Sequence, residues 1–287
     1  MNLATVWRRS NLLRVGASIL LVLVLAALLQ PLLNRLLIGD VSPITMGSFD
    51  PYLPPSSQHW LGTDRWGRDW MAQLILGLRY SLLVGTLAGA AATCFAVVFA
   101  FIAGYKGGAL DTVLRTVTDM VLVVPSWPIL VTLAAYISGL TVPVMALLLA
   151  AFSWPWPMRT IRAQVMSLRK QPYVDLAKIT DLHDLEIIFQ ELLPNMLPFL
   201  GVGLANATVG AMLAETGLAL IGLGPANIAS LGLMINWAMS WGALALGKWQ
   251  MMFAPVICLI LVFVSLHFIN IGLEEAYNPR LQRITGG

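Results

Sequence analysis

Long apolar runs constrain this chain more than any other feature of its sequence. Six of them stand out, at roughly 14–33, 81–104, 113–136, 141–156, 199–220 and 252–273. Most are close to the ~20 residues that an α-helix needs to cross a bilayer. The chain is 58% hydrophobic and only 11% charged, whereas soluble domains carry about 25% charged residues. The sequence therefore predicts an all-α, polytopic membrane protein with six transmembrane helices.

The first apolar run follows Arg8, Arg9 and Arg14, as the core of a signal peptide would. A signal core spans only about 7–15 residues and ends at a small-x-small cleavage site, and this run is longer and has no clear site of that kind. We therefore expect the run to be retained as an N-terminal anchor helix.

The distribution of basic residues predicts the orientation. If the N-terminus is cytoplasmic and the six runs alternate, all but five of the 17 Lys and Arg residues fall on the cytoplasmic side; the five are Arg35, Arg65, Arg68, Arg79 and Lys248. Short cytoplasmic loops are enriched in Lys and Arg. We expect both termini and the loop at 160–198 in the cytoplasm, and the segments 34–80 and 221–251 outside.

The longest predicted cytoplasmic loop contains two helical patterns. The first runs from about Tyr173 to Ile179, and the second from near Leu182 to just before Pro194. Asp181 is expected to N-cap the second helix, because its carboxylate can accept from free amides of the first turn. Apolar residues recur there at three- and four-residue steps: Leu182, Leu185, Ile188, Phe189 and Leu192. Such a face packs either on the protein's own helices or in a groove of a partner.

A polar motif with three tryptophans nearby precedes the second apolar run and reads W-L-G-T-D-R-W-G-R-D from Trp60 to Asp69. Its candidate site residues are Gly62, Thr63, Asp64, Gly67, Arg68 and Asp69. The tryptophans suit the headgroup level of a membrane. We favour a loop whose charges pair with one another, with direct ligand contact as the alternative.

Asp119 and Glu215 are the clearest ionisable residues within the predicted spans. A lone charge there costs about 2.5–3.5 kcal/mol, so it faces the bundle interior or a wet cavity. Arg115 lies four residues before Asp119 and can share its helical face. Packing by ion pairs is the favoured interpretation, and a polar pathway lined by Asp119 or Glu215 is the alternative.

Catalytic, metal-binding and nucleotide-binding signatures are not found. Cys94 and Cys258 lie inside apolar runs, without metal-ligand spacing. The chain has no HExxH, GxSxG or GxxxxGK[ST] pattern. We therefore assign no catalytic residue, no metal site and no cofactor to this chain.

The cytoplasmic loop resembles the EAA loop of bacterial ABC-importer permeases. That pattern has an acidic-Ala-Ala triplet, then a Gly, and ends in Ile, Leu and Pro. Asp175-Leu176-Ala177 stands at the triplet, Asp181 at the Gly, and Ile188, Leu193 and Pro194 at the end. Two residues depart from the pattern, Leu176 in place of Ala and Asp181 in place of Gly. The resemblance implies an ATPase-coupling loop with these site residues: Tyr173, Asp175, Leu176, Ala177, Asp181, Leu185, Ile188, Phe189 and Pro194.

Three more segments resemble C-type permeases of dipeptide and oligopeptide importers. L-G-T-D-x-x-G-R-D from Leu61, with Gly77–Leu82 after it, resembles a motif before the family's second span. Ala214–Gly224 is similar to E-x-x-L-S-F-L-G-L-G. Leu273–Leu281, reading L-E-E-A-Y-N-P-R-L, is similar to L-R-D-A-L-D-P-R-L. Together these segments cover most of the chain from Leu61 to Leu281.

The resemblance implies the type I ABC-importer permease architecture. Residues 1–80 would form an anchor helix and extracytoplasmic segment, and 81–287 the core permease domain with its coupling loop at 160–198. The implied partners are a second, B-type permease, two ATPase subunits that use ATP and Mg²⁺, and a solute-binding protein. The implied location is a bacterial or archaeal plasma membrane, and no nucleic acid is involved.

The cargo stays open among dipeptides, oligopeptides, nickel and oligosaccharides. Peptides come first. Oligosaccharides come second, because the segment Gly222–Asn227 with Met234, Asn236 and Trp237 resembles the oligosaccharide branch. Trp237, Trp241 and Trp249 could stack on sugar rings, and anchoring at the membrane interface explains them equally well. An ion-coupled secondary transporter using Asp119 and Glu215 is the alternative function, although six runs without a detectable inverted repeat count against it.

Overall fold

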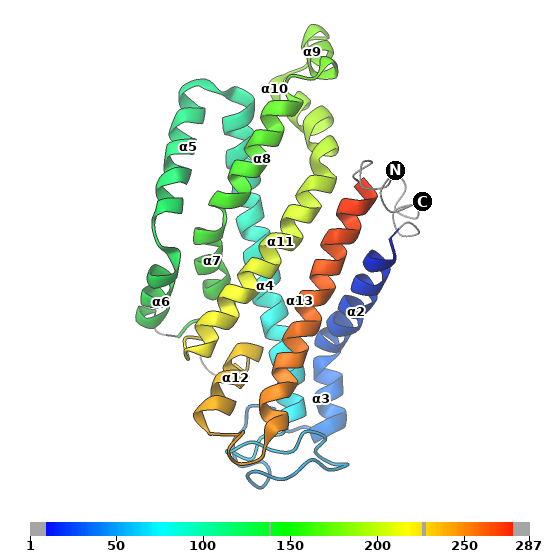
Figure 1. Cartoon of the computed structure of the whole chain (residues 1–287), viewed down its shortest axis with the longest axis vertical. Coiled ribbons are helices and arrows are strands. Elements are labelled where there is room, and N and C mark those ends of the chain that lie inside the picture. Colours follow the sequence, from blue (N-terminus) through cyan, green and yellow to red (C-terminus); the bar gives the residue numbers. More distant parts are fainter. Residues whose placement is uncertain (1–9, 138, 226–227, 278–287) are drawn as a thin grey trace.

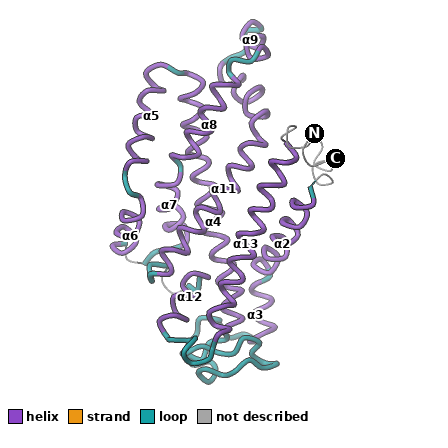
Figure 2. Tube along the Cα trace, viewed as in Figure 1, coloured by secondary structure: helices purple, strands orange, loops and turns teal. Residues whose placement is uncertain are grey.

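The computed structural model describes residues 10–137, 139–225 and 228–277, and every regular element in these ranges is helical (Figures 1 and 2). The elements before the middle of the chain are α2 Asn11–Leu28, α3 Gln30–Ile38, α4 Trp70–Phe101, η1 Ile102–Lys106, α5 Gly108–Val123, α6 Ser126–Tyr136 and α7 Val142–Ser153. The remaining elements are α8 Pro155–Leu168, α9 Pro172–Ile179, α10 Asp184–Glu186, η2 Ile187–Leu192, α11 Leu193–Leu220, α12 Leu231–Ser240 and α13 Trp249–Tyr277. The elements η1 and η2 are π-helices.

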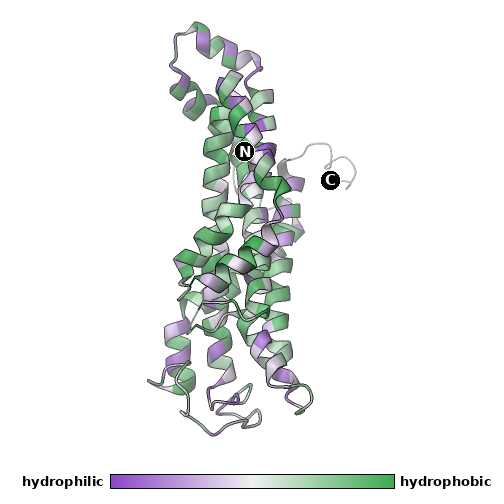
Figure 3. Cartoon of the chain, turned by 90° about the vertical axis from the view of Figure 1, so that its left-hand side faces the viewer, coloured by the Kyte–Doolittle hydropathy of each residue, from purple (hydrophilic) through white to green (hydrophobic). Residues whose placement is uncertain are grey.

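Four described helical stretches are long and apolar enough to cross a membrane: Asn11–Leu28, Trp70–Lys106, Asp184–Leu220 and Trp249–Glu275. Hydrophobic residues cover much of the length of the bundle, and hydrophilic ones gather toward its two ends (Figure 3). The prediction of an all-α membrane protein is confirmed.

The third predicted span, 113–136, is wrong as a single helix. The chain bends by 78° between α5 and α6. Pro125 has no backbone N–H and disfavours helical backbone at the residue before it, and Val124 accordingly is extended, with ψ 127°. The fourth predicted span is the 12-residue α7, which meets α8 at Trp154. By length and composition the described residues hold four spans, or five with the bent pair.

Glycines bring α4 and α11 into close contact at the centre of the bundle. A Cβ on Gly85 would lie 2.0 Å from Met212 Cγ, and one on Gly89 would lie 2.7 Å from the Thr208 Cα. Small residues allow such approach between helices in lipid. This close approach of α4 and α11 therefore occurs within one chain.

The two terminal helices, α2 and α13, lie side by side, and the start of α2 and the end of α13 lie at the same end of the bundle as α9 (Figure 1). Ser10 caps α2 by accepting from the Leu13 amide, and its hydroxyl donates to Glu275 at 2.8 Å. A Cβ on Gly272 of α13 would lie 2.5 Å from Leu13 Cβ. This end carries the segment 172–192, called here the helical loop.

The opposite end of the bundle carries the segment 39–69, called here the polar cap, together with α12 (Figures 1 and 2). The helix α4 begins at Trp70, capped by the Asp69 carboxylate. The predicted boundary at residue 80 therefore falls inside α4.

Candidate functional site

The helical loop stands on a buried apolar cluster. Val174 and Ala177 enter the cluster from α9, and Ile187 and Leu192 enter it from η2. The buried residues that they join on α4, η1, α8 and α11 are Ala96, Ala100, Phe101, Ala103, Tyr105, Met158, Ile161, Val165 and Met196. The loop is thereby packed onto the ends of the bundle helices.

The turn after α9 places an aspartate in the left-handed region. Asp181 has φ +61°. The Leu182 amide donates to the Ala177 carbonyl and the Asp181 amide donates to the Lys178 carbonyl, both at 3.2 Å. This is the pair of hydrogen bonds of a Schellman motif, whose left-handed position is usually Gly. Asp181 thus occupies the conformation that the Gly of the matched pattern would adopt most easily.

The N-cap of the second helix is His183, so the prediction that Asp181 caps it is wrong. The His183 imidazole accepts from the Leu185 amide, and Glu186 accepts from the His183 amide at 2.8 Å, which completes a capping box. Asp181 is unsuited to this role because its backbone terminates α9. The sequence contained a signal for the box, a Glu three residues after a polar side chain, although His is an uncommon N-cap.

The second helix was predicted to end just before Pro194, and this end is wrong. The helix continues through η2 into α11. Pro194 lies in the first turn of α11, directly after the π-helical turn. The missing N–H of a proline costs little where the helical hydrogen-bond register is changing. The loop is therefore joined to the long helix α11 without a break.

The widened register of η2 also divides the predicted apolar face. Ile187 and Leu192, five residues apart, are buried, and five residues is the hydrogen-bond spacing of a π-helix. Leu182 and Ile188 are partly buried in the same cluster. Leu185 and Phe189, which three- and four-residue spacing grouped with them, are exposed.

Four large apolar side chains of the helical loop therefore face outward, and we call them the docking patch. They are Leu176, Ile179, Leu185 and Phe189, with 62%, 80%, 58% and 62% of their surface exposed. Their neighbour Asp175 is also exposed and pairs with Lys178 at 3.4 Å. Leu176, the departure from the triplet pattern, adds to the apolar area of the patch.

Two polar contacts of Tyr105 tie η1 to the helical loop and to the end of α8 that precedes it. The Tyr105 hydroxyl donates to Asp184 at 2.9 Å, and Arg169 donates to the Tyr105 carbonyl at 2.5 Å. Sequence reasoning missed Tyr105 because 79 residues separate it from Asp184. On the other side of the loop, burial and then the charge of Glu191 raise the pKa of Tyr173 above its usual value.

The polar cap contains a buried carboxylate with four donors. Asp64 has no exposed surface. It accepts from the Trp66 and Arg68 amides at 2.8 and 3.0 Å, from Arg68 Nε at 2.7 Å and from Gln73 Nε2 at 3.1 Å. The Arg68 guanidinium also lies over the Trp237 ring, 4.8 Å from its centroid. The predicted pairing of the charges of this motif is thus observed for Asp64 and Arg68.

The second buried carboxylate of the cap, Asp69, serves two partners. One oxygen accepts from the Ala72 amide and caps α4, and the other lies 2.8 Å from His59 Nδ1. Two glycines of the same motif have left-handed backbone: a Cβ on Gly62 would lie 2.3 Å from the Leu53 carbonyl oxygen. A Cβ on Gly67 would lie 1.9 Å from the Phe49 carbonyl oxygen.

Thr63 completes the cap motif. Its hydroxyl donates to the Asp50 carbonyl at 2.6 Å and accepts from the Leu53 amide at 2.8 Å. The cap motif is therefore bonded to the polypeptide that precedes it.

Glu215 is a packing residue in this structure. It has no exposed surface, and it accepts from the Ser81 hydroxyl at 3.3 Å. The same hydroxyl accepts from the Leu231 amide at 3.2 Å. These contacts join α4, α11 and the start of α12.

The sequence suggested that Asp119 pairs with Arg115, but the structure gives Asp119 another partner. It accepts from Arg159 Nε of α8 at 3.0 Å, while Arg115 on its own helix is exposed. A second pair of the same kind joins Arg162 to Asp111 at 2.6 Å. Arg159 Nε and Nη2 both contact Asp119 Oδ1, whereas Arg162 forks across the two oxygens of the Asp111 carboxylate. Both pairs fix α5 against α8.

A family model described as "Binding-protein-dependent transport system inner membrane component" matches residues 96–283. The dipeptide transport system permease protein DppC of Bacillus subtilis (strain 168) is 30% identical over 281 residues, which cover 96% of this chain and 85% of that protein. The oligopeptide transport system permease protein OppC of Mycobacterium tuberculosis (strain H37Rv) is 32% identical over 237 residues, covering 82% and 80%. The protein of that name from Bacillus subtilis is 28% identical over 279 residues, covering 96% and 88%.

Proposed function

The chain belongs to the family of inner membrane components of binding-protein-dependent transport systems, and from this premise we propose that it carries peptides, with the docking patch as its contact to an ATPase. It is a permease subunit of an ABC importer and not an enzyme. This membership favours transport driven by a partner over a self-contained, ion-coupled transporter. The buried position of Glu215 and the pairing of Asp119 agree with that choice.

The exposed docking patch is the observation that supports the ATPase contact. Burial of apolar surface contributes about 25 cal/mol per Å², so four side chains more than half exposed favour association with an apolar groove. The patch lies on elements that are bonded to η1 and continuous with α11. A push on the patch would therefore be passed to a helix that runs the length of the bundle.

The remaining partners follow from the family. Importers of this type contain a further permease, ATPase subunits and a binding protein. We propose one second, B-type permease, two ATPases that bind ATP and Mg²⁺, and a solute-binding protein on the side of the polar cap. The excess of basic residues supports a cytoplasmic helical loop and cytoplasmic termini in a bacterial or archaeal plasma membrane.

Peptides are the cargo that the relatives support best. The relatives named above are called dipeptide or oligopeptide permeases. Against a sugar site, Trp237 and Trp241 stack on each other with ring centroids 6.0 Å apart, and Arg68 lies against the Trp237 ring. We therefore place peptides before oligosaccharides and nickel.

Uptake into proteoliposomes tests this proposal. The complete importer is placed in vesicles with ATP and the ATPase subunits on the inside and the binding protein on the outside. These vesicles should accumulate labelled di- and tripeptides. A complex with ATPases that cannot hydrolyse ATP is the control. Accumulation that is equal with and without hydrolysis, or accumulation of an oligosaccharide or nickel but of no peptide, would contradict the proposal.

A further inference from the structure

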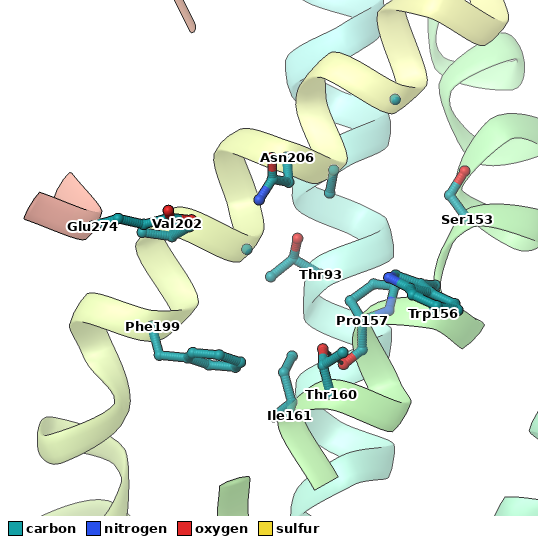
Figure 4. Close-up of a pocket in the computed structure, with 13 residues that line it drawn as sticks. Thr93, Ser153, Trp156, Pro157, Thr160, Ile161, Phe199, Val202, Asn206 and Glu274 are labelled. Atoms are coloured by element: carbon teal, nitrogen blue, oxygen red, sulfur yellow. Dashed lines mark hydrogen bonds between the residues drawn. The ribbon is translucent and has the colours of Figure 1, made fainter. Parts of the chain in front are cut away.

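A cavity of about 440 Å³ lies beside α11, at a place that the sequence did not indicate. Its walls come from α4, α8 and α11, and Glu274 of α13 stands at its edge (Figure 4). Small-molecule sites commonly occupy about 300–1,000 Å³. The cavity is therefore large enough for part of a small peptide.

Thr93 and Asn206 bring polar groups to the cavity, and of the two only Thr93 is buried within the part of the chain that the structure describes. Thr93 is 9% exposed, and its hydroxyl has no partner there. Asn270 Nδ2 donates to Asn206 Oδ1 at 2.6 Å, which leaves the Asn206 amide N–H groups free to donate into the cavity. An unsatisfied buried polar group costs about 1–3 kcal/mol. A ligand with its own donors and acceptors would recover part of this cost.

The edge of the cavity carries the negative charge of Glu274. Glu274 is exposed and has no ion-pair partner among residues 10–137, 139–225 and 228–277. In the C-terminal motif this residue stands where the similar pattern L-R-D-A-L-D-P-R-L has Arg. The charge at the cavity edge is therefore opposite to the one that the pattern would place there.

Two glycines leave part of the wall formed by α11 without side chains. Gly203 and Gly210 line the cavity, and a Cβ added to either would have nothing within 4 Å. These glycines differ from Gly85 and Gly89 of α4, which are packed against α11. Trp156 of α8 and Phe199 of α11 present apolar rings to the same space (Figure 4).

We propose that this cavity is the contact of this subunit with the amino-terminal end of a peptide, an inference that rests on the proposed function. Glu274 pairs with the peptide ammonium group. The Asn206 amide donates to a peptide carbonyl, and the Thr93 hydroxyl bonds to the peptide backbone. Trp156 and Phe199 pack against a peptide side chain. The ring contacts tolerate many side chains, so the charge at the amino end provides the recognition.

The test compares uptake of trialanine and N-acetyl-trialanine by the complete importer in proteoliposomes. Glu274→Gln should lower trialanine uptake at limiting concentration by about tenfold, as expected for the loss of one charge-assisted hydrogen bond. Uptake of N-acetyl-trialanine should not change. The binding protein is the same for both variants, so its own preference cancels. Asp40→Asn, which alters an exposed carboxylate at the other end, is the matched control and should have no effect.

A second variant fills the cavity without crowding this chain. Gly210→Leu projects into open space, so it should fold normally and slow uptake of both peptides. N-acetyl-Ala-Lys-Ala separates the amino end from a side-chain ammonium group. If Glu274→Gln lowers uptake of this peptide but not of trialanine, or leaves wild-type uptake of all three unchanged, the amino-end site is overturned. If the wild-type importer takes up no peptide, the proposed function is overturned together with the site.

Discussion

The two ends of the molecule treat charge and apolar surface in opposite ways. In the polar cap, Asp64 and Asp69 are buried with 0% and 2% of their surface exposed, and each is satisfied by several donors. In the helical loop, Leu176, Ile179 and Phe189 are exposed by 62% to 80%. The cap has folded its charges inward, whereas the loop has turned its apolar residues outward.

This contrast separates structure that is complete within one chain from structure that needs a partner. Buried carboxylates persist only when they are paired and hydrogen-bonded. A rigid loop with clustered apolar side chains marks an interaction site. Cap substitutions should therefore lower the stability of the subunit itself, and patch substitutions should act on assembly and coupling.

The largest expected effect on stability is at Asp64. Asp64→Asn or Asp64→Ala leaves Arg68 buried without its carboxylate, which costs about 3–5 kcal/mol. Thermal unfolding of the purified subunit in detergent measures this loss. The exposed pair of Asp40 with Arg35 is the control, because removing a surface pair costs about 0–1 kcal/mol. An equal shift for Asp64→Asn and Asp40→Asn would break the comparison between the cap and an ordinary surface.

The next effect is on assembly, at Phe189. Phe189→Ala should weaken association with the ATPase by about 1.5–3 kcal/mol, the worth of one fully buried side chain, and should lower transport accordingly. The thermal stability of the isolated subunit should not change, since the ring is 62% exposed there. Trp60→Ala, at 61% exposure in the cap, is the matched control. Loss of subunit stability with normal ATPase binding would reverse our assignment of this residue.

Asp181 sharpens the comparison within the loop. Gly at a left-handed position removes the strain of a Cβ, so Asp181→Gly should leave stability unchanged or raise it by about 0.5–1 kcal/mol. Asp181→Val should lower it, because β-branched residues are outliers at positive φ. The midpoint of denaturant unfolding distinguishes the two variants. A stability lower for Gly than for Val would contradict the turn geometry.

A small effect is also expected at Tyr105. Tyr105→Phe removes the hydrogen bond to Asp184 and should cost about 0.5–1.5 kcal/mol. Because this bond ties the loop to η1, transport per ATP hydrolysed should fall more than stability does. Thr112→Val removes a hydroxyl bonded only within exposed α5 and serves as the control. If both variants transport equally well, the bond has no part in coupling.

Much of this contrast could be predicted from the sequence. The apolar runs predicted the membrane class, and the charged motif predicted pairing among its own charges, which is observed for Asp64 and Arg68. The first loop helix was expected at Tyr173 to Ile179 and is observed at Pro172–Ile179. These features are local, so residue spacing contains the information.

The features that were missed depend on register and on distant neighbours. The change to a π-helix in η2 moved Ile187 into the core and Leu185 out of it, against the 3.6-residue expectation. Asp119 took Arg159, 40 residues away, in place of Arg115 on its own helix. The cavity is lined by residues of five helices, and no single segment could have indicated it.

Photo-crosslinking from position 189 tests the central claim most directly. A benzoyl-phenylalanine at Phe189, in the complete importer in a membrane, should crosslink to an ATPase subunit, and the same residue at Trp60 should not. The two positions are matched in exposure, at 62% and 61%, and lie at opposite ends of the bundle. An active importer in which position 189 yields no crosslink to an ATPase, or in which position 60 yields one, would contradict the account.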